Sequence, residues 1–119
     1  MFAAGNEGDM GYFSVHNPGL AKNALTVGAA ENPHPVDATF DQDYLAYFSS
    51  IGPTFDYRIK PDVVAPGYYI YSAQSTADAT SQSCSVIRKA GTSMATPGVA
   101  GNAALVREYF EVNGHLNFP

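Results

Sequence analysis

A segment that begins at Ser93 constrains the fold of this chain more than any other part of the sequence. Apolar residues recur there at spacings of three and four, the period of an α-helix, and further small apolar side chains fill the other sides of the first three turns. These residues are Ala95, Val99, Ala100, Ala103, Ala104, Leu105, Val106 and Phe110. A helix that is apolar nearly all round needs neighbours on more than one side. We therefore predict a helix from Ser93 that is buried over its first three turns and emerges at its last turn, which carries Arg107, Glu108 and Glu111. Asn113 and Gly114 suit a left-handed C-terminal cap.

Short apolar segments before this helix are typical of strands in a parallel sheet. We expect a strand to end within residues 1–4, a turn at 5–8, and a strand buried on both faces over 23–30. Further strands are predicted at 46–50, 63–65 and 68–73, and a polar loop at 74–83. The predicted fold is α/β: part of a three-layer, mostly parallel sheet with a buried helix, forming one partial domain over residues 1–119.

Composition excludes several classes of function. The net charge is −5 and the six Lys and Arg residues are scattered, so no basic patch for nucleic acid is visible. No apolar run approaches the about 18 residues of a membrane span, so we expect no membrane partner. The single cysteine, Cys84, excludes an internal disulfide and a multi-cysteine zinc site. Charged residues make up only 14% of the chain, which fits part of a larger body better than a free-standing small domain.

The residues around Ser93 are compatible with two roles for its hydroxyl. A serine at a helix N-terminus can cap the unpaired backbone N–H groups, or it can act as a nucleophile beside donors that hold an oxyanion. Gly91, Ala95 and Gly98 are small, which lets another backbone or a substrate approach closely. The segment is not the nucleophile elbow of the α/β-hydrolases, because Ala95 stands two residues after Ser93 where that motif has glycine.

Four segments together resemble the subtilisin-like serine proteases, the subtilases. The stretch "GTSMATPGVAG" (91–101) is similar to the catalytic-serine motif of that family, and "FAAGNEG" (2–8) to the segment with its oxyanion-hole asparagine. The stretches "AKNALTVGA" and "FSSIGPTFDYRIKPDVVAPG" are similar to further subtilase segments in the expected order. The resemblance covers nearly the whole chain. It implies a subtilisin-like fold and a serine endopeptidase that hydrolyses protein or peptide substrates through an acyl-enzyme.

The resemblance implies roles for residues at matching positions. Ser93 would be the nucleophile, and Asn6 would donate its side-chain amide to the oxyanion alongside the Ser93 backbone N–H. The residues of Gly-Asn-Glu-Gly taken alone fit an ordinary turn, which is the alternative for Asn6. Thr92 could support the oxyanion hole with its hydroxyl or could cap the helix, and the sequence leaves both open. The wall of the pocket for the substrate residue before the cleaved bond would be formed by Ala3, Ala4 and Gly5.

The other two members of a subtilase triad have no match in this sequence. The aspartate and histidine motifs lie far upstream of the oxyanion asparagine in that family, and only five residues precede Asn6 here. We expect both groups to be absent and the isolated chain to be inactive or nearly so, with the rest of the same catalytic domain as a partner. None of the histidines stands in the matching motif; they are His16, near the presumed pocket floor, His34 and His115.

The sequence contains no clear cofactor or metal site. No cofactor is predicted; Asp37, Asp41 and Asp43 could gather around calcium, but their spacing is not that of an EF-hand and a solvated acidic loop fits better. Most relatives are secreted, so the resemblance suggests an extracellular location.

The competing hypothesis is a non-catalytic α/β module that binds peptides or a partner and keeps relic protease motifs. Asp-Thr-Gly-like and His-Gly-Thr-like motifs upstream in the same gene would favour the protease.

Overall fold

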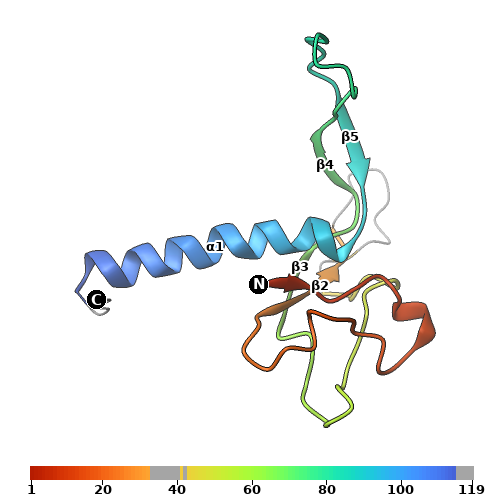
Figure 1. The fold of residues 1–119 in the computed structure, drawn as a ribbon, viewed down its shortest axis with the longest axis vertical. Coiled ribbons are helices and arrows are strands. Elements are labelled where there is room, and N and C mark those ends of the chain that lie inside the picture. Colours follow the sequence, from red (N-terminus) through yellow and green to blue (C-terminus); the bar gives the residue numbers. More distant parts are fainter. Residues whose placement is uncertain (33–40, 42, 115–119) are drawn as a thin grey trace.

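The structure is a computed structural model, and it describes residues 1–32, 41 and 43–114. Figure 1 shows a small sheet, a long helix and a projecting hairpin. The elements in chain order are β1 (Phe2–Ala3), the 3-10 helix η1 (Gly8–Met10), β2 (Thr26–Ala30), β3 (Val63–Pro66), β4 (Ile70–Ala73), β5 (Val86–Lys89) and α1 (Thr92–Val112).

The sheet at the centre of the fold is parallel, as predicted. Its strand order is β1-β2-β3, with Ala3 opposite Val27 and Val27 opposite Val63. All five residues of β2 are buried, because β2 is the middle strand and α1 packs over one face through Ala95 and Val99. The α/β class and the strands expected near residues 1–4, 23–30 and 63–65 are therefore confirmed.

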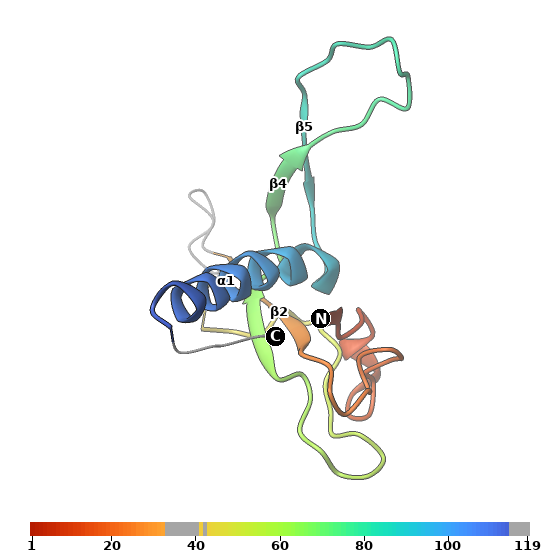
Figure 2. The same ribbon diagram turned by 60° about the vertical axis from the view of Figure 1, so that its left-hand side comes forward.

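The prediction of a buried helix is wrong for this structure. α1 begins at Thr92, and only Thr92 and Ala95 are fully buried. Residues 97, 98 and 100–102 are exposed within the three turns expected to be buried, and Leu105 just beyond them is 63% exposed, whereas the exposure of the last turn is as expected. The three-stranded sheet β1-β2-β3 contacts the first turns of α1, while the rest of the helix extends beyond this sheet (Figures 1 and 2). The expected left-handed cap is present, since Gly114 has φ 68° and its N–H donates to the Glu111 carbonyl.

The hairpin β4–β5 was only partly predicted. The two strands pair antiparallel, with Ile70 opposite Lys89 and Ala73 opposite Val86, and they project away from the sheet (Figure 2). β4 confirms the strand expected within residues 68–73, and residues 74–83 form the connecting loop, as predicted. The next residue, Cys84, is an exposed free thiol. β5 was missed, because a run as short as Val86–Lys89 is a weak strand signal until its partner is known.

The strand predicted at residues 46–50 is also wrong, because the serines at its end bond to other segments. The Ser49 hydroxyl accepts a hydrogen bond from the Ala29 N–H at 3.0 Å, and the Ser50 hydroxyl accepts one from the Glu7 N–H at 3.0 Å. Serine hydroxyls that bind backbone groups offer an alternative to the hydrogen bonds of a strand ladder. The segment therefore links β2 to the turn after β1, and within it only Ala46 makes a backbone–backbone hydrogen bond to β2, through its N–H and the Ala29 carbonyl, so no strand forms over residues 46–50.

An ion pair between the buried Lys60 and the partly exposed Asp62 anchors the chain that leads into β3. The Lys60 side chain is 3% exposed, and its Nζ donates to Asp62 Oδ2 at 2.6 Å, to the Ala24 carbonyl at 2.7 Å and to Thr26 Oγ1 at 3.1 Å. These three bonds use all the donors of the ammonium group. Burial raises the pKa of the Asp62 carboxyl, but the hydrogen bonds from Lys60 and from the Thr26 N–H outweigh it, so this pKa lies below its usual value.

Lys60→Met is expected to lower the free energy of unfolding by about 2 kcal/mol, because it removes the donor to the Ala24 carbonyl and to Thr26 Oγ1 and leaves the partly exposed Asp62 carboxylate without its partner. Urea denaturation of the full-length gene product measures the loss. A carboxyl with a lowered pKa in the folded state stabilises the protein above the pKa of an unfolded aspartate, about 3.9, and that contribution is lost as pH falls through the lower folded value. In Lys60→Met, the free energy of unfolding should therefore fall less steeply as the pH is lowered. Lys22 is exposed, so Lys22→Met should change neither the free energy of unfolding nor its dependence on pH. A Lys60→Met protein as stable as the wild type would contradict the stabilising role of the Lys60 ammonium group.

Candidate active site

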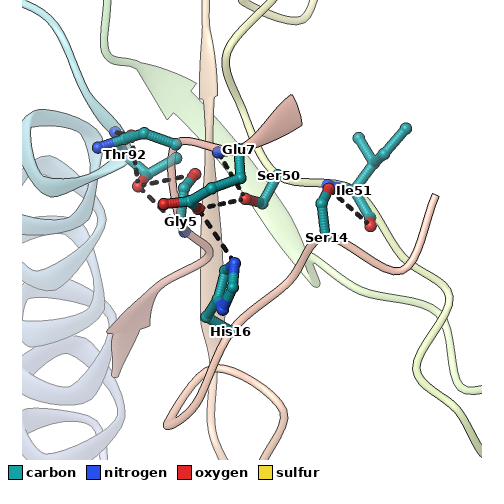
Figure 3. A network of polar contacts seen from close by, with 8 residues as sticks. Gly5, Glu7, Ser14, His16, Ser50, Ile51 and Thr92 are labelled. Carbon is teal, nitrogen blue, oxygen red and sulfur yellow. Dashed lines mark hydrogen bonds and ion pairs between the residues drawn. The ribbon is translucent and has the colours of Figure 1, made fainter. Parts of the chain in front are cut away.

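Thr92 joins the start of α1 to the turn that follows β1. Its backbone N–H donates to Asn6 Oδ1 at 2.9 Å, and its hydroxyl lies 3.1 Å from the same oxygen. The hydroxyl also lies 3.2 Å from the Gly5 carbonyl and accepts from the Gly5 N–H at 3.3 Å (Figure 3). Because the hydroxyl has one proton, it donates either to Asn6 or to Gly5 at a given moment. One buried side chain, 1% exposed, thus holds two segments that are far apart in the sequence.

The helix N-terminus is capped from outside the helix. The capping position is Gly91, which has no side chain and a φ of 153°, a conformation that favours glycine. Asn6 Oδ1 takes the place of a capping side chain by accepting the Thr92 N–H, one of the groups that a helix start leaves unpaired. In the part of the chain that the structure describes, the Thr92 hydroxyl bonds to Gly5 and Asn6 and to no N–H of the helix.

The same contacts orient the carboxamide of Asn6. Since Oδ1 is turned toward Thr92, the Nδ2 group is turned away from it and is left to donate elsewhere. No acceptor for Nδ2 is found among the described residues, and the residue is exposed. An amide held at its oxygen and unoccupied at its nitrogen is a preorganised hydrogen-bond donor.

Ser93 follows Thr92 directly and lies on the surface. It is the second residue of α1, and within residues 1–32, 41 and 43–114 neither its hydroxyl nor its N–H has a hydrogen-bond partner. A helix start carries a partial positive charge and unpaired donors. The structure therefore brings an accessible hydroxyl, a free backbone N–H and, through Thr92, a free amide into one region, and neutral donors of this kind can stabilise an oxyanion.

Thr92→Val is expected to lower the free energy of unfolding by about 2 kcal/mol, because the isosteric change leaves the Gly5 N–H with no acceptor in a partly buried position. Thr92→Ser, which keeps the hydroxyl, should lose less than half as much. Chemical denaturation of the full-length gene product measures both values. Equal losses for the two variants would show that the threonine methyl group, and not the hydroxyl, holds the segments together.

The residues expected to line the substrate pocket lie beside this junction. Ala3 is half-buried at the end of β1, and Ala4 is fully buried, with its N–H donating to the Val27 carbonyl at 2.9 Å. Gly5 has φ 116°, and a Cβ added there would lie 2.6 Å from Glu7 Oε2 and 2.7 Å from Ser50 Oγ. The positive φ favours glycine at this position, and a side chain there would also have to displace the Glu7 carboxylate and the Ser50 hydroxyl.

The remaining candidates are separated from Ser93 or lie outside the described residues. The exposed His16 pairs with Glu7, with 3.5 Å between Nε2 and Oε2, and the nearby Asn17–Pro18 bond is cis. His34, His115 and Asp37 lie outside the described residues. Asp41 and Asp43 are exposed, and no cluster of three or more metal-ligating side chains occurs in residues 1–32, 41 and 43–114. None of the described helices is both long enough and apolar enough to cross a membrane.

The sequence matches the profile of a known protein family over nearly its whole length. The sequence profile of the peptidase S8 group, described as the subtilase family, matches residues 1–114. The chain belongs to the subtilase family. The resemblance carried by the four sequence segments is thereby confirmed.

Individual subtilase relatives are much longer than this chain. It is 43% identical over 124 residues to pyrolysin of Pyrococcus furiosus, covering 89% of this chain and 8% of pyrolysin. It is 40% identical over 111 residues to serine protease AprX of Bacillus subtilis, covering 87% of this chain and 24% of AprX. The chain thus spans less than a quarter of the length of each of these relatives.

Solved protease structures share the fold. The prenylagaramide maturation protease PagA is similar with a TM-score of 0.67 and 32% identity, over 94% of this chain and 32% of PagA. The self-cleaved protease domain of PatA is similar with a TM-score of 0.68 and 30% identity, over 94% of this chain and 34% of that domain. The sheet and α1 of this subtilase are therefore arranged as in protease domains of known structure.

Proposed function

We propose that this subtilase chain provides the nucleophile and the oxyanion hole of a serine endopeptidase. The observation that carries the proposal is the Thr92 junction, which holds the carboxamide of Asn6 against the start of α1, one residue from Ser93. The Ser93 hydroxyl, the Ser93 N–H and Asn6 Nδ2 are all without partners in the described part of the chain. Acyl transfer to a serine requires a hydroxyl as nucleophile and hydrogen-bond donors for the oxyanion, and these three groups would meet both requirements.

The proposed reaction has two steps. Ser93 Oγ forms a bond to the carbonyl carbon of the peptide, loses its proton to a base, and the carbonyl oxygen becomes an oxyanion that accepts hydrogen bonds from Asn6 Nδ2 and the Ser93 N–H. The C–N bond then breaks, and the amine leaves with the proton that the base returns. Water hydrolyses the ester by the same route and restores the Ser93 hydroxyl. The two donors act chiefly on charge that develops in the transition state, so they accelerate the chemistry more than they strengthen substrate binding.

The general base in this proposal comes from outside residues 1–119. His16 is held by Glu7 and has no contact with Ser93 among the described residues. A serine without a base is a weak nucleophile near neutral pH. We therefore expect the 119-residue chain alone to be inactive or nearly so, and the histidine and aspartate to be supplied by the rest of the protease domain, as the family resemblance implies.

Hydrolysis of fluorescently labelled casein by the full-length gene product tests the proposal. The expected result is release of peptides that stops after treatment with a fluorophosphonate, a reagent that forms an ester with activated serines. A protein that binds casein peptides but releases no fragments, with or without the reagent, would favour the competing non-catalytic peptide-binding module. A mixture of the 119-residue chain and casein serves as the inactive reference.

A further inference from the structure

We propose that Ser50 is the positioning residue that holds Asn6 in the oxyanion hole, an inference that rests on the proposed function of Asn6. The subtilase resemblance assigned no role to Ser50, and residues 46–50 were expected to form a strand. In the structure Ser50 is completely buried and faces the turn after β1 instead (Figure 3).

Ser50 binds both residues that flank Asn6. Its backbone N–H donates to the Gly5 carbonyl at 3.0 Å. Its hydroxyl accepts the Glu7 N–H at 3.0 Å and donates to Glu7 Oε2 at 3.1 Å. The hydroxyl therefore uses its one proton and accepts one hydrogen bond, and the backbone of Asn6 is held on both sides by one residue.

The Gly5 backbone lies close to Ser50 and to Glu7. A Cβ on Gly5 would lie 2.7 Å from Ser50 Oγ and 2.6 Å from Glu7 Oε2, so the Gly5 backbone lies close against both groups. His16 Nε2 lies 3.5 Å from Glu7 Oε2 and borders the carboxylate on another side. The carboxylate of Glu7 thus borders Ser50, His16 and the Gly5 backbone, while 43% of the Glu7 side chain stays exposed.

Ser50 and Thr92 hold Asn6 in complementary ways. Thr92 binds the side-chain oxygen of Asn6, whereas Ser50 binds the backbone before and after it. An oxyanion donor works only when it is held close to the position of the developing charge, and a displacement of about 1 Å is enough to lower the rate strongly. Without the Ser50 hydroxyl, the Glu7 N–H and carboxylate lose their partner, while Gly5 stays bound to the Ser50 N–H and to Thr92. The chain on the Glu7 side of Asn6 is then less restrained, and a shift there would move the amide of Asn6.

The neighbouring Ser49 provides a matched control. It is also buried, at 1% exposure, and its hydroxyl also accepts a backbone N–H at 3.0 Å. That N–H belongs to Ala29 in the middle of β2, so the Ser49 hydroxyl supports the sheet and not the turn. Removal of either hydroxyl leaves one backbone N–H without its acceptor, but only the Ser50 change alters the surroundings of Asn6.

The experiment compares Ser50→Ala and Ser49→Ala in the full-length gene product, each with and without Asn6→Ala. We expect Ser50→Ala to lower kcat for a peptide substrate about 20-fold with KM changed by less than about twofold, and Ser49→Ala to change kcat by less than about threefold. In the Asn6→Ala background, Ser50→Ala should lower kcat by less than about twofold further, because the residue that it positions has already lost its amide.

Two results would overturn the proposal. One is a Ser50→Ala enzyme with the kcat of the wild type. The other is a loss of kcat of the same size in the Asn6→Ala background, which would mean that Ser50 acts independently of Asn6. A wild-type protein without hydrolase activity would contradict the proposed function instead. Crystal structures of the Ser50→Ala and Ser49→Ala proteins then test the positioning directly: Asn6 must be displaced in the first and unmoved in the second.

Discussion

Ser93→Ala is expected to lower kcat for peptide hydrolysis by about 10⁶-fold, the magnitude measured for loss of the nucleophilic serine in subtilisin. The reason is that alanine removes the oxygen that, in the proposed reaction, forms the acyl-enzyme, while the proposed oxyanion donors and the fold remain. Ser93 is exposed and its side chain has no hydrogen bond within the described residues, so the change should alter the free energy of unfolding by less than about 0.5 kcal/mol.

Two readouts separate loss of the nucleophile from loss of structure. Covalent labelling of the full-length gene product by a fluorophosphonate should disappear in Ser93→Ala, while its denaturation curve remains that of the wild type. Ser83→Ala is the control, because Ser83 is an exposed serine in the β4–β5 connection whose hydroxyl bonds to Ser85. It should keep full labelling and activity. Equal labelling of Ser93→Ala and the wild type would remove Ser93 from the role of nucleophile.

Asn6→Ala is expected to lower kcat by about 10²–10³-fold, the magnitude measured for loss of the oxyanion asparagine in subtilisin. KM should change little, because the amide acts on charge that appears after the substrate has bound. The change also removes the Oδ1 that accepts the Thr92 N–H, so the free energy of unfolding should fall by about 1 kcal/mol, as on loss of a helix cap.

Asn6→Asp separates the two functions of this side chain. Aspartate keeps an oxygen acceptor for the Thr92 N–H and favours the positive end of the helix, so stability should stay near that of the wild type. It has no N–H to donate and adds negative charge beside the oxyanion, so kcat should fall at least as far as in Asn6→Ala. Steady-state kinetics and chemical denaturation of both variants measure this. An active Asn6→Asp enzyme would contradict the role of the amide as donor.

Sequence patterns predicted the parts of this fold that depend on local periodicity. The apolar run at residues 23–30 indicated a strand buried on both faces, and β2 has that burial along its whole length. The period of the segment after Ser93 predicted a helix, and α1 is present. The predicted burial of α1 was wrong. An apolar helix surface indicates that the helix can pack against other elements, but not whether those elements are present.

The hydrogen-bond network of the site was harder to predict, because it depends on contacts between distant segments. The residues next to Ser93 and Asn6 are enough to propose a role for each, but the bond between Asn6 and Thr92 joins positions 86 residues apart. The bonds of Ser50 to Glu7 span 43 residues. Two adjacent serines within an expected strand are a weak signal for such contacts, since serine disfavours a strand and readily bonds to backbone groups elsewhere.

A crystal structure of the full-length gene product after reaction with a fluorophosphonate tests the central claim most directly. The phosphonyl group imitates the tetrahedral intermediate, so one of its oxygens stands where the oxyanion forms. We predict a covalent bond from phosphorus to Ser93 Oγ, with that oxygen about 3 Å from both Asn6 Nδ2 and the Ser93 N–H. An adduct on another residue, or one on Ser93 whose oxygens are far from Asn6, would contradict the account.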